Sequence, residues 1–242
     1  MSLNVAIHKA AHVRGASVHS RSSCRYATQN NMMRIDNNAL FFGNFVDAEL
    51  KLIDLCDYLN DINKFISRKR RYKKKKYGEG VLKNIAIEMF SESFTSTLYN
   101  SVLISAWVFM EAEFKGYCNA MQKAKGIVLT YSDLKGPAIL RFRNYTLKVL
   151  KLDLRLKDEN WEDLKAINEI RNSLVHTDGS VGNKKLVNNF IKRHKVTGLL
   201  REENIVLSKN ILMLIIMLFR LFIQRIYYVA LESFPGEHVL KK

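Results

Sequence analysis

The stretch LYNSVLISAWVFMEAEFKGYCNAM, residues 98–121, decides the fold class of this chain. Its apolar residues fall on nearly every face of a helix. A helix that is apolar all round must be enclosed by other elements, as the central member of a bundle is. We therefore expect an all-α protein built around this segment.

Further helices are predicted on both sides of the central segment. Apolar residues recur at steps of three and four over 38–66, where Asp36 can cap the start. The central helical region extends over about 81–123, with an interruption near 91–96 left open. A helix is expected over 137–156, another from an Asn160 cap to His176, and a last one from a Ser208 cap to about Glu232.

Residues 180–207 are mixed and polar, and two short apolar runs there flank residues 201–204 as in a small hairpin. The whole predicts a bundle of four to five long helices, with one small β-hairpin between the last two. Residues 38–242 would form a single helical domain with a basic loop at 68–80. Arg220 and Arg225 interrupt the last helix, which favours a buried bundle helix over a membrane span.

The charge balance of the chain points to a polyanionic partner. Lys and Arg number 39 against 23 Asp and Glu, a net charge of +16. Nucleic acid is the commonest polyanion to explain such an excess, and an anionic membrane surface is the second choice. Three scattered cysteines exclude a disulfide framework and favour a reducing compartment such as the cytoplasm. Residues 1–37 are interpreted as a basic, poorly structured arm, with a mitochondrial transit peptide as the alternative.

A run of eight basic residues and two tyrosines supplies half of the net charge. Lysines and arginines there can contact phosphates, and a tyrosine can stack on bases. The alternative is a solvated loop. The residues assigned to RNA binding are Arg68, Lys69, Arg70, Arg71, Tyr72, Lys73, Lys74, Lys75 and Lys76.

The stretch EIRNSLVHTDG, residues 169–179, contains the candidate catalytic residues Arg171, Asn172 and His176. Asn172 and His176 lie one helical turn apart, so the amide can orient the imidazole. A histidine that titrates near neutrality can act as a general acid or base. Arg171 projects about 140° from His176, on an apolar arc, and so needs a carboxylate, a phosphate or a subunit boundary as its partner.

This strip resembles the signature of the HEPN superfamily, an arginine and a histidine separated by four to six residues, often with a polar residue after the arginine. Arg171, Asn172 and His176 fit the commonest form of that pattern. The resemblance implies a dimeric endoribonuclease that needs no metal or other cofactor, of the kind found among toxins and antiviral defence effectors. Its partners would be RNA, a second copy or a related chain, and an inhibitory antitoxin or sensor protein.

The resemblance also implies the reaction. A ribose 2′-hydroxyl attacks the neighbouring phosphate and leaves a 2′,3′-cyclic phosphate and a 5′-hydroxyl. His176 would move the proton, Arg171 would stabilise charge on the phosphoryl oxygens, and Asn172 would orient His176 or the phosphate.

Two other readings remain open. The first is a non-catalytic helical module that binds RNA or a partner protein, and the second is a membrane-surface protein. Glu111, in the apolar central segment, is a candidate partner for Arg171. His8, His12 and His19 lack nearby carboxylates or thiols, so a metal site there is not expected.

Overall fold

The computed structural model describes residues 25–77, 81–177 and 179–234. The chain divides into two compact units, Met1–Asp36 and Asn37–Lys242. Residues 25–36 of the first unit are helical, and the second unit contains the bundle.

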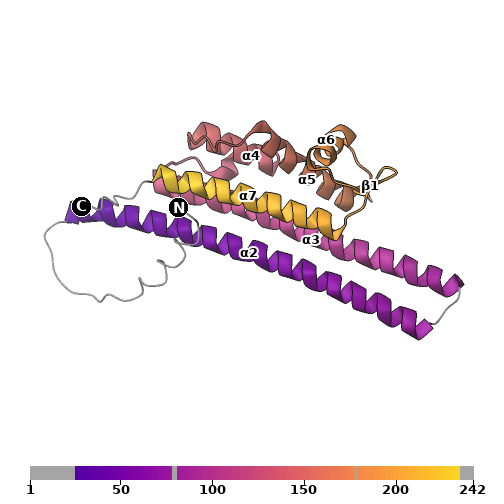
Figure 1. Ribbon diagram of the computed structural model, residues 1–242. Coiled ribbons are helices and arrows are strands. Elements are labelled where there is room, and N and C mark those ends of the chain that lie inside the picture. The colour runs from indigo at the N-terminus through magenta and orange to yellow at the C-terminus, as the bar shows by residue number, and fades with distance from the viewer. Residues whose placement is uncertain (1–24, 78–80, 178, 235–242) are drawn as a thin grey trace, which may run out of the picture. The chain divides into compact units, whose positions relative to one another are not determined.

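Two long helices, α2 (Arg25–Tyr77) and α3 (Val81–Lys125), run antiparallel in the bundle (Figure 1). The Tyr99 hydroxyl donates to Asn63 Oδ1 at 2.9 Å, and the rings of Phe65 and Phe94 lie 5.9 Å apart. These contacts join the helices in the half that ends in the basic run.

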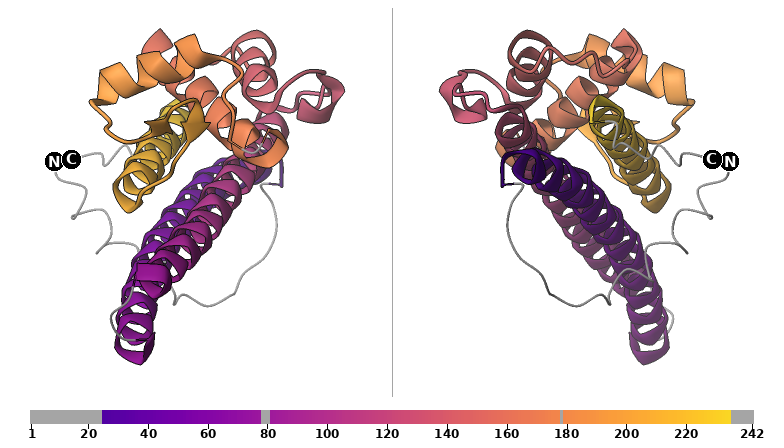
Figure 2. Two further views of the ribbon diagram at one scale, coloured as in Figure 1. Left: turned by 90° about the vertical axis from the view of Figure 1, so that its right-hand side faces the viewer. Right: turned by 90° about the vertical axis from the view of Figure 1, so that its left-hand side faces the viewer.

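The remaining helices cover α3 from other sides. The last helix, α7 (Lys209–Ser233), lies along α3, and the rings of Trp107 and Phe219 are 6.0 Å apart. In Figures 1 and 2, α2 lies on one side of α3 and α7, and three shorter helices lie on the other. The shorter helices are α4 (Ala138–Asn144), α5 (Asp158–His176) and α6 (Lys184–His194).

The core is centred on α3 and α7, as the apolar central segment predicts. Side chains of α3 that are fully buried include Val102, Leu103, Met110, Phe114 and Tyr117. Burying a side chain of this size contributes roughly 1.5–3 kcal/mol, so this helix organises the packing of its neighbours.

The small hairpin has strands β1 (Leu200–Arg201) and β2 (Asn204–Ile205), which pair antiparallel with Leu200 opposite Ile205. It lies between α6 and α7. The prediction of an all-α bundle with a small hairpin between the last two helices is therefore confirmed. Ser208 caps α7 as predicted, because its side chain accepts a hydrogen bond from the backbone N–H of Ile211 at 3.3 Å.

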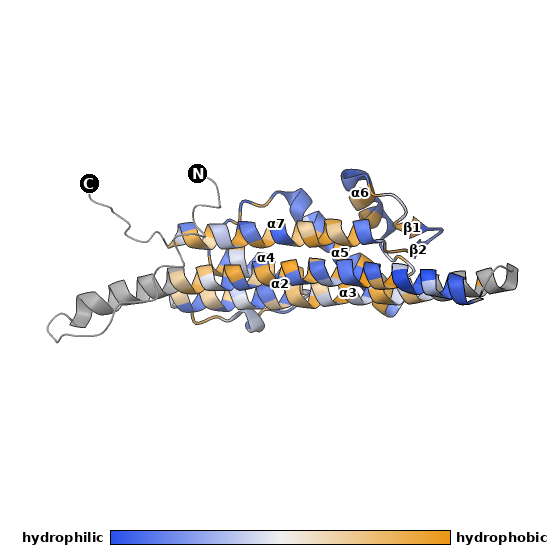
Figure 3. Cartoon of the chain, turned by 60° about the horizontal axis from the view of Figure 1, so that its bottom comes forward, coloured by the Kyte–Doolittle hydropathy of each residue, from blue (hydrophilic) through white to orange (hydrophobic). Residues whose placement is uncertain are grey.

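The predicted basic loop at 68–80 is wrong for residues 68–77, which form the last turns of α2. The end of α2 that carries them is blue in Figure 3. Lys and Arg are good helix formers, and no glycine or proline occurs in the run before Gly78. Asp36 is also not a cap, because α2 begins earlier, at Arg25. Residues 1–24 of the predicted arm lie outside the described residues.

The predicted helix over 137–156 is too long. α4 passes into a short π-helix, η2 (Tyr145–Val149), and the chain then has no regular secondary structure as far as Lys157. Leu152 and Leu154 are buried there, between exposed Lys151 and Arg155. Lys151 has a positive φ of 54°, which stops the helix from continuing, and Arg155 has a positive φ of 49° before α5 begins.

Three other boundaries differ from the predictions. α3 continues through 91–96 without interruption. α5 begins at Asp158, so Asn160 lies within its first turn, where its Oδ1 accepts a hydrogen bond from the Lys157 N–H at 3.0 Å. α6 was not expected. Asn183 caps it, accepting from the Leu186 N–H at 3.0 Å, and Val187 and Phe190 are buried.

α7 is long and apolar enough to cross a membrane by length and composition alone, and half of that segment is buried inside the protein. Its buried face packs on α3. Its exposed face carries Met217, Leu221 and Tyr228, each more than half exposed. It is a bundle helix with one apolar face uncovered in the single chain.

Candidate functional site

The predicted strip lies in the last two turns of α5. Trp161, Leu164, Ile167 and Ile170 are buried along this helix and fix its rotation. The helix stops after His176, where Gly179 has a φ of 92° and its N–H donates to Ser173 O at 2.8 Å. That conformation favours glycine, which explains the Gly at this position.

Arg171 is half-buried and held on one side. Its Nη1 donates to Asn172 Oδ1 at 2.9 Å. Its Nε atom is buried and has no hydrogen-bond partner within the described residues. A guanidinium carries five donors, so this one is oriented by the neighbouring amide and keeps donors for an anion.

His176 is exposed and is the last residue of α5. Among the described residues, its imidazole makes no hydrogen bond, and no contact joins it to Arg171. The strip therefore presents one oriented cation and one exposed histidine, and no hydrogen bond joins them within the described residues.

Two predicted contacts of the strip are wrong. Asn172 directs its Oδ1 to Arg171, and no hydrogen bond joins it to His176 in the part of the chain that is described. Glu111 accepts a hydrogen bond from Trp107 Nε1 at 2.9 Å and forms no ion pair with Arg171. Arg171 and Asn172 are therefore paired through the Nη1–Oδ1 hydrogen bond.

A buried acid with two basic partners was missed from the sequence. Asp163 of α5 forms an ion pair with Arg193 Nη1, and its Oδ2 lies 2.9 Å from His194 Nε2. Arg193 also donates to Glu159 O at 3.1 Å, and the ring of His194 packs on Phe190. The basic pair closes an unpredicted helix, so the sequence alone offered no reason to bring it to Asp163.

Glu169 provides a second tie between α5 and the segment that leads into α6. Its Oε1 accepts from the Asn183 N–H at 2.8 Å. A side chain at Gly182 would place its Cβ 3.0 Å from the same oxygen, so Gly182 permits the close approach. These ties hold the loop after His176 against the helix that carries the strip.

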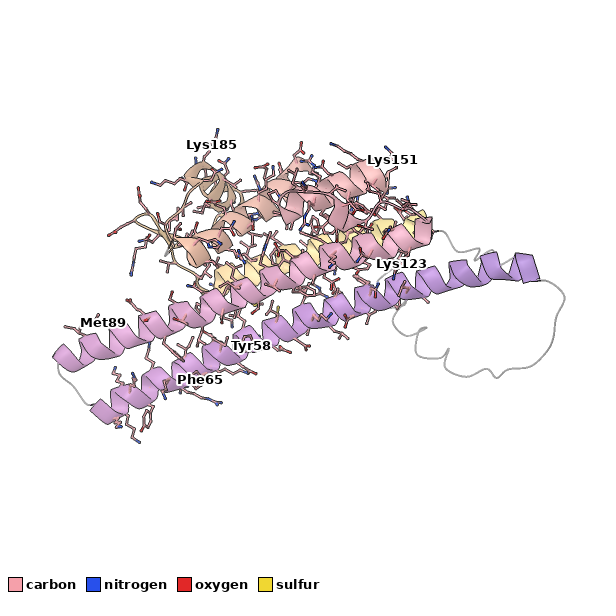
Figure 4. All side chains as sticks on the ribbon, turned by 180° about the vertical axis from the view of Figure 1, so that it is seen from behind. Tyr58, Phe65, Met89, Lys123, Lys151 and Lys185 are labelled. Atoms are coloured by element: carbon pink, nitrogen blue, oxygen red, sulfur yellow. The ribbon has the colours of Figure 1, made fainter. Side chains whose placement is uncertain are left out.

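The basic run forms a helical surface at the end of α2. Arg68, Lys69, Lys74 and Lys75 are exposed, and Tyr72 is 58% exposed. Figure 4 shows Phe65 near this end of the α2–α3 pair. Lys185 of α6 and Lys151 lie at the two ends of the layer formed by the shorter helices. The basic run and the strip are therefore on different elements.

No group of three or more His, Cys, Asp or Glu side chains within the described residues is arranged to hold a metal ion. Comparison with known proteins adds no relative: no family model matches the chain, and no significant match exists among curated proteins or solved structures.

Proposed function

We propose that this protein is a metal-independent endoribonuclease of the HEPN type, a toxin or defence effector, with Arg171, Asn172 and His176 as its active-site strip. The observation that supports the proposal most is the Arg171 guanidinium. It is fixed by Asn172 at 2.9 Å, keeps a buried and unpaired Nε, and lies five residues before an exposed histidine.

The chemistry needs one proton removed and one supplied. The ribose 2′-oxygen forms a bond to phosphorus, the bond from phosphorus to the 5′-oxygen breaks, and the leaving oxygen takes a proton. His176 accepts the proton of the 2′-hydroxyl, and the imidazolium so formed donates a proton to the leaving oxygen. Arg171 stabilises the negative charge that builds on the non-bridging oxygens.

The test is incubation of purified protein with RNA in EDTA, with His176→Ala and Arg171→Ala as matched variants. Cleavage by the native chain should persist and leave a 2′,3′-cyclic phosphate and a 5′-hydroxyl, whereas both variants should be inactive but folded. DNA lacks the 2′-hydroxyl and should survive. A need for magnesium, or products with 5′-phosphates, would contradict the assignment.

A second candidate is a non-catalytic helical module that binds RNA or a partner protein. It is favoured by the absence of any contact between Arg171 and His176 in the described part of one chain. Tight RNA binding without cleavage, unaffected by His176→Ala, would establish this alternative.

A further inference from the structure

A groove of about 400 Å³ lies between α5 and α7. Half of its lining residues are apolar: Leu156, Leu164, Ile167, Leu218, Leu221 and Phe222. The other half are polar or charged, and pockets that combine apolar walls with polar groups are typical of sites for small ligands. The volume is too small for a nucleic-acid duplex and suits one extruded base.

The groove and Arg171 share one face of α5. Arg171 follows Ile167 by four residues and Leu164 by seven, so the three project from the helix in nearly the same direction. The rise from Ile167 to Arg171 is about 6 Å. Ile167 is the lining residue of α5 nearest to Arg171 in sequence, so a strand with a base in the groove can bring a neighbouring phosphate to the guanidinium.

The rim of the groove is basic. Arg155, Lys157 and Arg225 line it. Arg225 is anchored, since its Nε donates to Leu154 O at 3.2 Å, and Arg155 pairs with Glu232 at 3.1 Å. Lys157 is exposed and forms no ion pair within the described residues, which leaves it available to a phosphate.

Two acidic residues line the groove, and Glu159 is exposed and forms no ion pair within the described residues. The Asp163 carboxylate forms an ion pair with Arg193, and its Oδ2 lies 2.9 Å from His194 Nε2. Asn160 uses its Oδ1 on the Lys157 N–H, so its NH₂ group remains free to donate to a base edge. Base edges are accessible in this way only in single-stranded RNA.

We propose that the α5–α7 groove is a base-binding subsite for single-stranded RNA, next to the phosphate that Arg171 contacts. The proposal rests on the proposed function, because it takes RNA as the ligand of the strip. In this subsite, Asn160 and the apolar lining residues set the base preference. Lys157 contacts the neighbouring phosphate.

The test measures binding of a fluorescent single-stranded RNA to the His176→Ala protein, so that cleavage does not interfere. Leu221→Glu should weaken binding about tenfold or more, because the base loses its apolar contact. Met217→Glu is the matched control: it makes the same charge change one turn earlier on α7, at an exposed residue that does not line the groove. Lys157→Ala should lower the salt dependence by roughly one phosphate contact.

Equal effects of Leu221→Glu and Met217→Glu, or no effect of either, would overturn the subsite. The subsite would also be overturned if Leu221→Glu weakened binding of fully paired RNA to the same extent. If Leu221→Glu instead changed the mass of the protein in solution, this surface would be a protein interface. A native chain that binds through the groove but never cleaves RNA leaves the subsite standing and refutes the ribonuclease.

Discussion

Arg171 is the residue on which the proposed chemistry depends. Its planar guanidinium is held by Asn172 Oδ1 and can give two parallel hydrogen bonds to a phosphate, which a lysine cannot. Arg171→Lys should keep the fold and the charge yet lower the turnover number about 100-fold, the usual cost of losing an oriented donor to transition-state charge. The measurement is single-turnover cleavage of a defined RNA.

Asn172→Ala distinguishes the orientation of the Arg171 guanidinium from its charge. It leaves the guanidinium present but releases its orientation, so the turnover number should fall by less than for Arg171→Lys while RNA binding is retained. A turnover number unaffected by both changes would remove Arg171 from the site.

Glu113 of α3 is a residue whose effect depends on pH. Burial raises the pKa of its carboxyl, although the Tyr227 hydroxyl, 3.1 Å away, and the charge of Lys51 oppose the shift. The folded state then binds this proton more tightly than the unfolded state, so the free energy of unfolding falls as pH rises from the ordinary pKa of 4.5 through the raised value.

Glu113→Gln removes this titration and keeps an oxygen that can accept from Tyr227. The difference in Tm between variant and native chain should therefore increase in favour of the variant as pH rises through that window. Glu92→Gln, at an exposed position of α3, controls for the loss of a charge. A constant difference across pH would show that burial does not control Glu113.

At the scale of elements, the ion pairs of Asp163 join α5 to the end of α6. Its side chain is only 8% exposed, so removing its charge leaves Arg193 and His194 partly buried without their counter-ion. Asp163→Asn should lower the free energy of unfolding by about 3 kcal/mol. Denaturation by urea measures this directly.

Asp158→Asn is the matched control on the same helix. Asp158 pairs with Arg143, but its side chain is 90% exposed, so the loss should stay below about 1 kcal/mol. Equal losses from both substitutions would mean that the Asp163 cluster is no stronger than a surface pair.

The basic end of α2 is the second element that carries a prediction. A helix presents its lysines at defined angles to a phosphate backbone, and each contact releases counterions. Replacing Lys74 and Lys75 with alanine should lower the dependence of RNA affinity on salt by roughly one to two contacts. Replacing all of Lys73 to Lys76 should lower it further and leave the fold intact.

A double variant of α6 with the same change in charge tests whether the effect on salt dependence is specific to α2. Lys185 and Lys192 are exposed on α6, at a different element from the basic run. If their double alanine variant changes the salt dependence as much as the α2 variant, RNA does not distinguish the two surfaces and the α2 run is only a solvated helix end.

At the scale of the whole molecule, one chain does not join Arg171 to His176. We therefore expect a homodimer, or a pseudo-dimer with a related partner, in which two strips face a shared basic cleft. Activity per chain should fall when the protein is diluted below its dissociation constant, with mass followed by analytical ultracentrifugation.

Mixing inactive variants tests where each group comes from. If Arg171 of one copy works beside His176 of the other, Arg171→Ala and His176→Ala proteins should restore cleavage when mixed, because the heterodimer keeps one intact pair. A monomer that is fully active at high dilution would refute the shared site.

The sequence alone predicted the elements whose apolar residues or capping residues give one clear local pattern. The apolar run of α3 and the Ser208 cap of α7 are local signals, so the all-α bundle and the small hairpin were predictable. The same local patterns misplaced the segment after α4. Leucines there alternate with charged residues at 150–156, a period of two that does not fit a helix, although the neighbouring residues have helical propensity.

Tertiary packing decided what the local patterns leave open. α2 and α3 are joined just before the basic run by the Tyr99–Asn63 hydrogen bond and the Phe65–Phe94 contact, which link residues far apart in the sequence. The partners of Asp163 lie about thirty residues away on α6, and the groove beside Arg171 exists only because α7 packs against α5. A sequence names the residues capable of chemistry, but the distances between them are set by which helix faces are buried against one another.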